Sequence, residues 1–238
     1  MNKVTDLDQV IDKVQDGMTL LFGGFCGVGA PLTCIQKIAD KGVKNLTIMS
    51  VVATYPGGKF DLAPLFSNGQ VKKFICAHAG TSPEAVSALK NGNLDIEYYP
   101  MGSWIEKVRA GGAGLGGVLT RTGLGSLVEE GKEKIVVDGK EYILEKPLRA
   151  DMAFIKGYKA DLWGNVQYRY AAINTNPTVA MAADYTVAEV NEIVPVGKLD
   201  PQCVGTPAVF VHAVVQGKTL EEQATTFRDL WSRTGQLR

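Results

Sequence analysis

Residues 16–31 read DGMTLLFGGFCGVGAP and decide the fold. Met18 to Phe22 form a short apolar run of the kind found in buried strands, and the glycine-rich segment Gly23 to Gly29 follows it directly. Pro31 stands where the first residue of a helix would lie, ahead of apolar residues at helical spacing. The stretch therefore predicts a strand, a glycine loop and a helix in immediate succession.

The same alternation of apolar strands and amphipathic helices recurs along the chain. Strands are expected at residues 46–52, 71–77, 94–99, 152–156, 185–190 and 208–215, and helices near residues 10–14, 83–90, 102–109 and 177–182. Asp138-Gly139 separates two further short strands and is a strong signal of a type I′ hairpin. Because helices between apolar strands imply a parallel sheet, we predict an α/β fold: an open, mostly parallel sheet with helices on both faces, plus a small β-hairpin region.

Composition limits the class of protein. The 238 residues and 45% hydrophobic content suffice for one well-buried domain, residues 1–238, which ends in a polar C-terminal tail over residues 227–238. Lys+Arg and Asp+Glu both count 25, so no global field favours nucleic acid or an anionic membrane. The four cysteines have no metal-binding spacing and suit a reducing compartment, so we expect a cytoplasmic protein without a bound metal. The charged N-terminus lacks a signal core, and no stretch approaches the ~20 apolar residues that span a bilayer.

The loop from Gly23 to Gly29 has four glycines in seven residues, which permit positive φ and leave backbone N–H groups open to a ligand. A helix start adds partial positive charge, so the loop suits an anion or the oxygen of a polarised thioester carbonyl. The alternative is that the glycines only make a tight strand-to-helix turn. The loop matches neither the dinucleotide fingerprint nor the Walker motif.

A second glycine cluster, Gly112 to Gly117, does satisfy G-x-G-x-x-G literally. The fingerprint needs a strand before it and a helix after it, whereas a helical segment precedes this cluster, so nicotinamide or flavin binding is disfavoured. A second backbone-exposed loop near the first, with Gly112 and Gly114 as substrate contacts, stays open. His78 follows an apolar strand, where open α/β sheets bind ligands, and is either a substrate contact or a structural histidine.

The order of several motifs is similar to the α subunits of family I coenzyme A transferases. The match begins with residues 16–25 and 27–31, and it continues through Arg109–Gly114, Thr122–Gly125, Glu129–Gly131 and Pro147–Asp151. The resemblance covers about Asp6 to Gly217. It implies an open α/β sheet domain, which such enzymes contain once in each of an α and a β subunit.

The resemblance also implies a chemistry in which CoA passes between a thioester and a carboxylate through a glutamyl-CoA thioester, with the glutamate in a Glu-Asn-Gly context of the β subunit. Here Asn68-Gly69 and Asn91-Gly92 follow Ser67 and Lys90, not glutamate, so we expect no catalytic residue in this chain. We expect CoA as a substrate, no permanently bound cofactor, and a β-subunit partner in a heterodimer assembled to a heterotetramer. The expected CoA-binding residues are Gly23, Gly24, Phe25, Cys26, Gly27, Val28 and Gly29.

Two segments depart from the family pattern. Thr120-Arg121-Thr122-Gly123 stands where related α subunits often have Thr-Pro-Thr-Gly, and residues 172–177 replace a pattern with arginine and phenylalanine. Arg121 is either a contact to a substrate carboxylate or CoA phosphate, or an exposed structural arginine. The match is nearest to enzymes of acetate, butyrate and acetoacetate, and a dicarboxylate such as succinate or glutaconate is the alternative. A nucleotide-binding or regulatory module and a thioester hydrolase acting alone are the competing functions.

Overall fold

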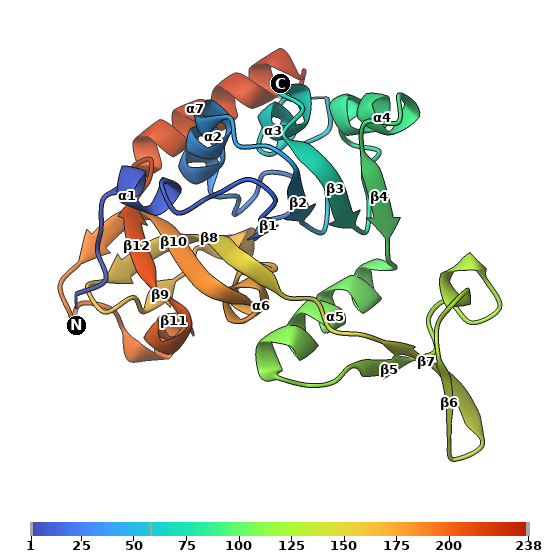
Figure 1. Cartoon of the computed structure of the whole chain (residues 1–238). Helices are drawn as coiled ribbons and strands as arrows, with labels where there is room; N and C mark the ends of the chain where they lie inside the picture. The colour runs from blue at the N-terminus through green and yellow to red at the C-terminus, as the bar shows by residue number, and fades with distance from the viewer. Residues whose placement is uncertain (1, 58, 237–238) are drawn as a thin grey trace.

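A parallel sheet forms the centre of the molecule, which the computed structural model describes over residues 2–57 and 59–236 (Figure 1). Its strands lie in the order β4-β3-β2-β1-β8-β10-β12, and each neighbouring pair is parallel. Their bounds are β1 Thr19–Phe22, β2 Leu46–Met49, β3 Val71–Cys76, β4 Asp95–Tyr98, β8 Ala150–Asp161, β10 Ala183–Val194 and β12 Ala213–Gln216. The expected open, mostly parallel α/β sheet is confirmed.

Strand β8 is much longer than β1, and this difference leaves room beside its carboxyl half. β1 pairs with β8 only as far as Phe154, and farther along β8 the short antiparallel strand β9 (Val166–Gln167) takes its place. β11 (Val204–Thr206) pairs with β9 in turn. The loop that leaves β1 therefore lies next to the part of β8 that follows Phe154.

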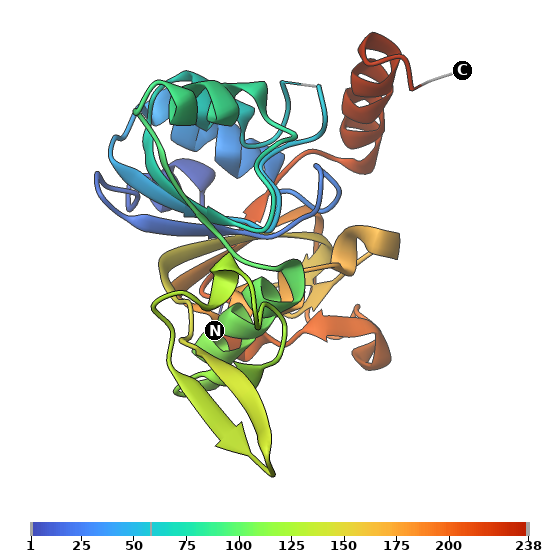
Figure 2. The same ribbon diagram turned by 90° about the vertical axis from the view of Figure 1, so that its right-hand side faces the viewer.

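Helices cover both faces of the sheet, as the sequence predicts (Figure 2). One face packs against α1 (Leu7–Ile11), α2 (Leu32–Lys41), α3 (Ala63–Ser67) and α4 (Pro83–Lys90), around a core that includes Phe22, Phe74 and Phe154. The other face packs against α5 (Met101–Ala113) and α6 (Asn176–Met181), with Trp104 fully buried between them and the sheet. The alternating residues of the strands thus supply two separate apolar layers.

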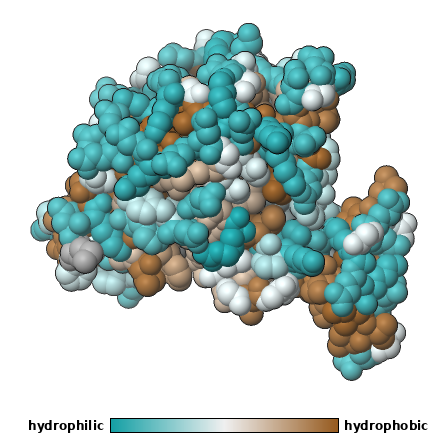
Figure 3. All heavy atoms as spheres, viewed as in Figure 1, coloured by the Kyte–Doolittle hydropathy of each residue, from teal (hydrophilic) through white to brown (hydrophobic). Residues whose placement is uncertain are grey.

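A three-stranded antiparallel sheet projects from the body as an arm (Figure 1). It consists of β5 (Val118–Thr120), β6 (Lys134–Val137) and β7 (Lys140–Glu145). Asp138 and Gly139 have φ angles of +50° and +71°, which confirms the type I′ hairpin. Hydrophobic residues lie at the top of the arm and on its lower part (Figure 3), and Leu127, in the 3₁₀ turn between β5 and β6, is 82% exposed. Arg121 also lies exposed in this arm, away from the glycine loop.

Three expectations from the sequence are wrong. The helix expected at residues 102–109 continues as α5 to Ala113, so Gly112 lies inside a helix and not in a loop. The strand expected at residues 208–215 is a 3₁₀ turn followed by β12, because the backbone N–H groups of Phe210 and Val211 donate to the carbonyls of Pro207 and Ala208 and not to a neighbouring strand. The expected polar tail is mostly helix α7 (Leu220–Arg233); residues 237–238 lie outside the described part.

Helix α7 was missed although its sequence carries a start signal. Thr219 and Glu222 form a reciprocal capping box, and Leu230 is fully buried. The helix is amphipathic, and its apolar face turns toward the body. Across the described residues, no helix combines the length and the apolar character that a membrane crossing requires.

Candidate functional site

The glycine loop leaves the carboxyl end of β1 and folds back on itself before α2. Phe25 and Val28 exchange backbone hydrogen bonds of 2.9 and 3.0 Å, which close the loop into a small hairpin. Gly24, Gly27 and Gly29 have φ angles of +112°, +81° and +73°, a region that residues with a side chain rarely adopt. The glycines are therefore required by the conformation of the backbone.

Space around the loop is equally restrictive. A Cβ atom at Gly23 would lie 1.9 Å from Oδ1 of Asn176, and one at Gly29 would lie 2.7 Å from the carbonyl oxygen of Ala172. Asn176 is fully buried at the start of α6, donates to the carbonyl of Gly29 at 3.0 Å, and accepts from the backbone N–H of Lys156 at 3.0 Å. This one amide side chain thus fixes the loop against the end of β8.

The segment before α6 holds the other side of the loop. The backbone N–H of Gly24 donates to the Thr175 hydroxyl at 3.0 Å, and the Asn174 amide donates to the carbonyl of Val28 at 2.9 Å. Residues 172–177 depart from the family pattern in sequence, and the structure places them directly against the glycine loop. Their function was not predicted, because the partners are 151 and 146 positions apart in the chain.

The start of α2 is not open to an external anion. The prediction that this helix start helps the loop to bind an anion is therefore wrong. The fully buried carboxylate of Glu189 accepts from the backbone N–H groups of Thr33 and Cys34 at 3.0 and 2.9 Å. It occupies the positive end of the helix dipole from within the protein. Within the described residues, the loop amides of Cys26, Gly27 and Gly29 have no acceptor, so these are the donors that remain for a ligand.

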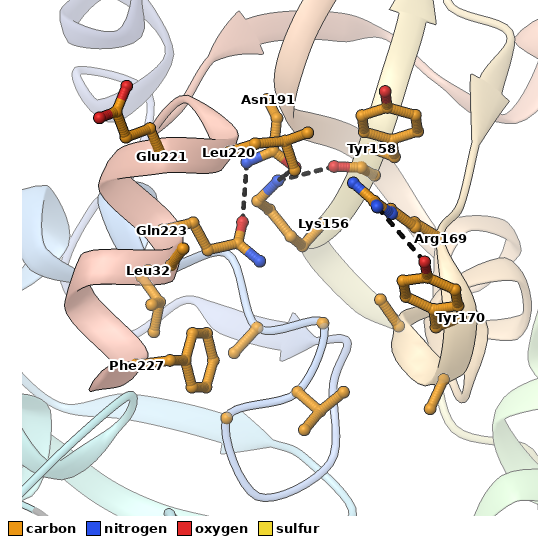
Figure 4. Close-up of a pocket in the computed structure, with 18 of the residues that line it drawn as sticks. Leu32, Lys156, Tyr158, Arg169, Tyr170, Asn191, Leu220, Glu221, Gln223 and Phe227 are labelled. Carbon is orange, nitrogen blue, oxygen red and sulfur yellow. Dashed lines mark hydrogen bonds between the residues drawn. The ribbon is translucent and has the colours of Figure 1, made fainter. Parts of the chain in front are cut away.

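A cavity of about 660 Å³ opens beside the loop (Figure 4). Residues 27–30 of the loop form one wall, the end of β8 and residues 169–172 form the next, and α7 closes the remaining side. Its lining is mostly apolar, with Val28, Leu220 and Phe227 among the contacts. An apolar cavity of this volume with a few polar groups is typical of a small-molecule binding site.

Lys156 supplies the buried charged group of this cavity, whereas Arg169, Glu221 and Arg228, which also line it, are exposed. Its side chain is buried, and Nζ donates to the carbonyl of Gly157 at 2.6 Å and to Oδ1 of Asn191 at 2.8 Å. Burial lowers the pKa of Lys156 to about 8, although the nearby Glu189 carboxylate acts in the opposite direction. The Asn191 amide donates in turn to Oε1 of Gln223 on α7 at 2.7 Å (Figure 4).

Asp61 lies near Cys26 and Gly27 of the loop and is not among the residues that line this cavity. Its carboxyl group accepts from the backbone N–H groups of Tyr55 and Leu62, and burial raises the pKa of Asp61 to about 8. Burial and the nearby Asp61 both raise the pKa of the Cys26 thiol. A thiol with a raised pKa is a poor nucleophile, so the Cys26 side chain is not activated for covalent chemistry.

The other predicted substrate contacts do not join this cavity. Gly112 lies in α5, where a Cβ atom would meet Cβ of Met181 on α6 at 2.5 Å, so it serves close helix packing. Gly114 is the left-handed C-cap of α5. His78 is exposed beyond β3, outside the set of residues that line the cavity. Among the described residues, no cluster of three or more histidine, cysteine or acidic residues is arranged to hold a metal.

Comparison with known proteins assigns the chain to a family. Residues 4–217 match the family model described as Coenzyme A transferase. The chain belongs to the coenzyme A transferase family. The match ends just before α7, so this helix, which closes one side of the cavity, lies beyond the segment that the family model covers.

Relatives that align over most of this chain are alpha or A subunits of CoA transferases. The alpha subunit of acetate CoA-transferase from Escherichia coli K12 is 42% identical over 214 residues, which cover 90% of this chain and 96% of the relative. The acetoacetyl-CoA:acetate/butyrate CoA transferase alpha subunit of Clostridium acetobutylicum is 41% identical, with coverage of 90% and 98%. The equivalent subunit of succinyl-CoA:3-ketoacid coenzyme A transferase from Helicobacter pylori J99 is 41% identical, with coverage of 94% and 96%. This transferase chain is accordingly an α subunit.

Solved structures support the fold. The acyl-CoA transferase YdiF of Escherichia coli O157:H7 superposes with a TM-score of 0.82 at 24% identity, over 91% of this chain and 47% of YdiF. The transferase chain thus spans about half the length of that protein. At this identity the similarity concerns the fold alone.

Proposed function

We propose that this transferase chain is the α subunit of an enzyme that moves CoA between a short-chain acyl-CoA and a free carboxylic acid, and that it pairs with a β subunit in a cytoplasmic heterotetramer. The names of its relatives, which include acetate, butyrate, acetoacetyl-CoA and succinyl-CoA, support this substrate class. CoA enters as a substrate and not as a bound cofactor. The observation that carries the proposal is the glycine loop: its backbone N–H groups at Gly27 and Gly29 have no acceptor within the described residues, and both residues line a mostly apolar cavity.

The glutamate nucleophile belongs to the β subunit in this proposal. Transfer needs a carboxylate that attacks the thioester carbonyl, and donors that stabilise the negative charge developing on its oxygen. The amides of Cys26, Gly27 and Gly29 are held in place by the hydrogen bonds of Asn176 and Thr175, so they need no reorganisation as charge develops. The loop residues Gly23 to Gly29 would therefore bind CoA and its thioester where the two subunits meet.

The test compares the isolated chain with the assembled pair. The chain alone is expected to lack transfer activity and to gain it when it is co-expressed with a β subunit that contains Glu-Asn-Gly. A panel of acetate, butyrate, acetoacetate, succinate and glutaconate defines the acid. Robust activity of the isolated chain would contradict the division of labour.

Trapping identifies the nucleophile in the same preparation. Acyl-CoA followed by borohydride should reduce a glutamate of the β chain, which mass spectrometry detects as a mass change in one β-chain peptide. A reduced glutamate in this chain would overturn the assignment and support a thioester hydrolase that acts alone.

A further inference from the structure

Lys156 has one donor more than the protein uses. An ammonium group carries three N–H donors, and within the described residues Nζ of Lys156 has only two acceptors, the carbonyl of Gly157 and Oδ1 of Asn191. The residue is only 5% exposed and lines the cavity beside the glycine loop. A buried donor without an acceptor costs free energy, so the third N–H favours a ligand oxygen in the cavity.

The charge around Lys156 decides what kind of oxygen fits. Both direct acceptors are neutral, and the carboxylate of Glu189 lies near enough to raise the pKa of Lys156 against the effect of burial. Glu189 is itself buried and offsets the positive charge. A second anion at Nζ would leave a negative charge that no buried cation offsets, because Arg169 and Arg228 of the lining are exposed to solvent, whereas a neutral carbonyl oxygen satisfies the donor and adds no charge.

The remainder of the wall fits the carbon chain that carries such an oxygen. Ala30, Leu32 and Leu220 contribute apolar surface, and the amide of Gln223 points into the cavity beside Lys156 (Figure 4). Gly27 and Gly29 of the loop line the same cavity as Lys156. A 3-oxoacyl group has a thioester carbonyl for the loop, a short apolar carbon chain, and a second, neutral carbonyl oxygen for Lys156.

We infer that Lys156 is a specificity-determining residue that binds the keto oxygen of 3-oxoacyl substrates. The inference rests on the proposed function, because the carboxyl or thioester end of the substrate lies at the glycine loop. A site built to hydrogen-bond a substrate oxygen discriminates strongly against an analogue that lacks it, since the protein donor then stays unpaired. Acetoacetate and butyrate form such a pair, because both have four carbons and only acetoacetate has the keto group.

The experiment measures kcat/KM of the assembled α–β complex for acetoacetate and for butyrate, with acetyl-CoA as the donor. Lys156→Met keeps the length of the side chain and removes every donor. Its acetoacetate value should fall about 10- to 100-fold relative to its butyrate value. Lys156→Gln, which retains N–H donors, should recover part of the preference.

Lys159→Met is the matched control. Lys159 lies on the same strand and pairs with the half-exposed Glu192 at 2.8 Å, outside the cavity lining. It should leave the ratio of acetoacetate to butyrate unchanged. The wild-type complex supplies a readout that needs no folded variant: the C3 carbon resonance of bound ¹³C-acetoacetate should move downfield, as expected for a carbonyl that accepts a hydrogen bond from an ammonium group.

Each outcome decides a different claim. An equal loss for both acids in Lys156→Met, or an unshifted C3 resonance in the wild type, overturns the role of Lys156 and leaves the transferase function standing. A complex that transfers CoA to no acid in the panel overturns the proposed function and the role of Lys156 with it.

Discussion

Gly27 of the glycine loop must be a glycine for two separate reasons, its backbone conformation and the space around it. Its φ of +81° excludes a β-branched residue, and a Cβ atom would approach the ring of Phe60 to 2.9 Å. Gly27→Val should therefore displace the loop amides and reduce the transfer activity of the α–β complex by at least about 100-fold, the scale of losing an oxyanion donor. Steady-state kinetics, together with trapping of the β-chain glutamate, measure this effect.

Gly69→Val separates local damage from general backbone strain. Gly69 also has a left-handed φ, +61°, yet a Cβ atom added there would have no neighbour within 4 Å, and the residue precedes β3 far from the cavity. The strain should cost about 1–2 kcal/mol of stability and leave kcat unchanged. Full activity in Gly27→Val would remove the loop from the mechanism.

Because Asp61 is buried, it makes the folded protein less stable as the pH rises. Burial raises its pKa to about 8 in the folded state, against about 3.9 in the unfolded chain, so the folded state binds more protons between these values. Its contribution to stability is complete below about pH 4 and is lost as the pH rises through 8. Asp61→Asn should gain on the order of 3 kcal/mol relative to wild type between pH 5 and pH 8. Urea unfolding at both pH values measures the difference, and a pH-independent difference would contradict the raised pKa.

The residues of the site differ in how far the sequence reveals them. The glycine loop was predictable because its conformation and contacts are local, within one strand-to-helix connection. Lys156, Glu189 and Asn191 were not, because they meet only when β8 and β10 pair across 10 registered positions. Their one local signal was a charged or polar residue inside an apolar strand, which requires an internal partner when buried.

At the scale of elements, the parallel sheet followed from periodicity, whereas the ends of elements did not. The glycines near residue 112 suggested a loop, yet Gly111 and Gly112 let α5 approach Leu148 and Met181 closely, so tertiary packing outweighed their low helix propensity. The C-terminal segment suggested a tail because its charged residues hide the apolar positions. The capping box at Thr219 and the helical spacing of Phe227, Leu230 and Trp231 were the signals that predict α7.

The arm is joined to the body by a buried ion cluster. Glu145 of β7 is 1% exposed and accepts from Lys107 of α5 at 2.9 Å and from Lys132 at 2.5 Å. Lys107 also lies 4.1 Å from the centroid of the Tyr99 ring. Glu145→Ala leaves two ammonium groups unpaired, and it should cost about 3–5 kcal/mol of stability.

A double variant tests the origin of that loss. Glu145→Leu combined with Lys107→Met replaces the buried pair by apolar side chains, and it should recover most of the stability that Glu145→Ala loses. Denaturant unfolding of the three chains provides the comparison. If the double variant is less stable than Glu145→Ala, the cluster acts through a contact other than the ion pair.

At the scale of the whole molecule, all strands of the parallel core end at one edge of the sheet. The glycine loop after β1, the Asp61 segment after β2 and the end of β8 therefore lie together, where open α/β sheets bind ligands. Apolar side chains are exposed there: Phe25 and Val28 are each 41% exposed, and Tyr170 is 83% exposed. The formal net charge of zero gives no long-range electrostatic steering of a partner. Because apolar side chains are exposed at this edge, it is the surface that a β subunit would cover.

Hydrogen exchange of the chain with and without its β subunit tests that arrangement. Amides of residues 24–29 and 170–173 should exchange about tenfold more slowly in the complex, equivalent to roughly 1.4 kcal/mol of added protection, because the partner covers the carboxyl edge. Amides of residues 42–45, which enter β2 at the opposite edge, should keep their rates and serve as the internal control. Protection confined to residues 42–45 would place the partner on the wrong side of the sheet for a catalytic glutamate to reach the glycine loop.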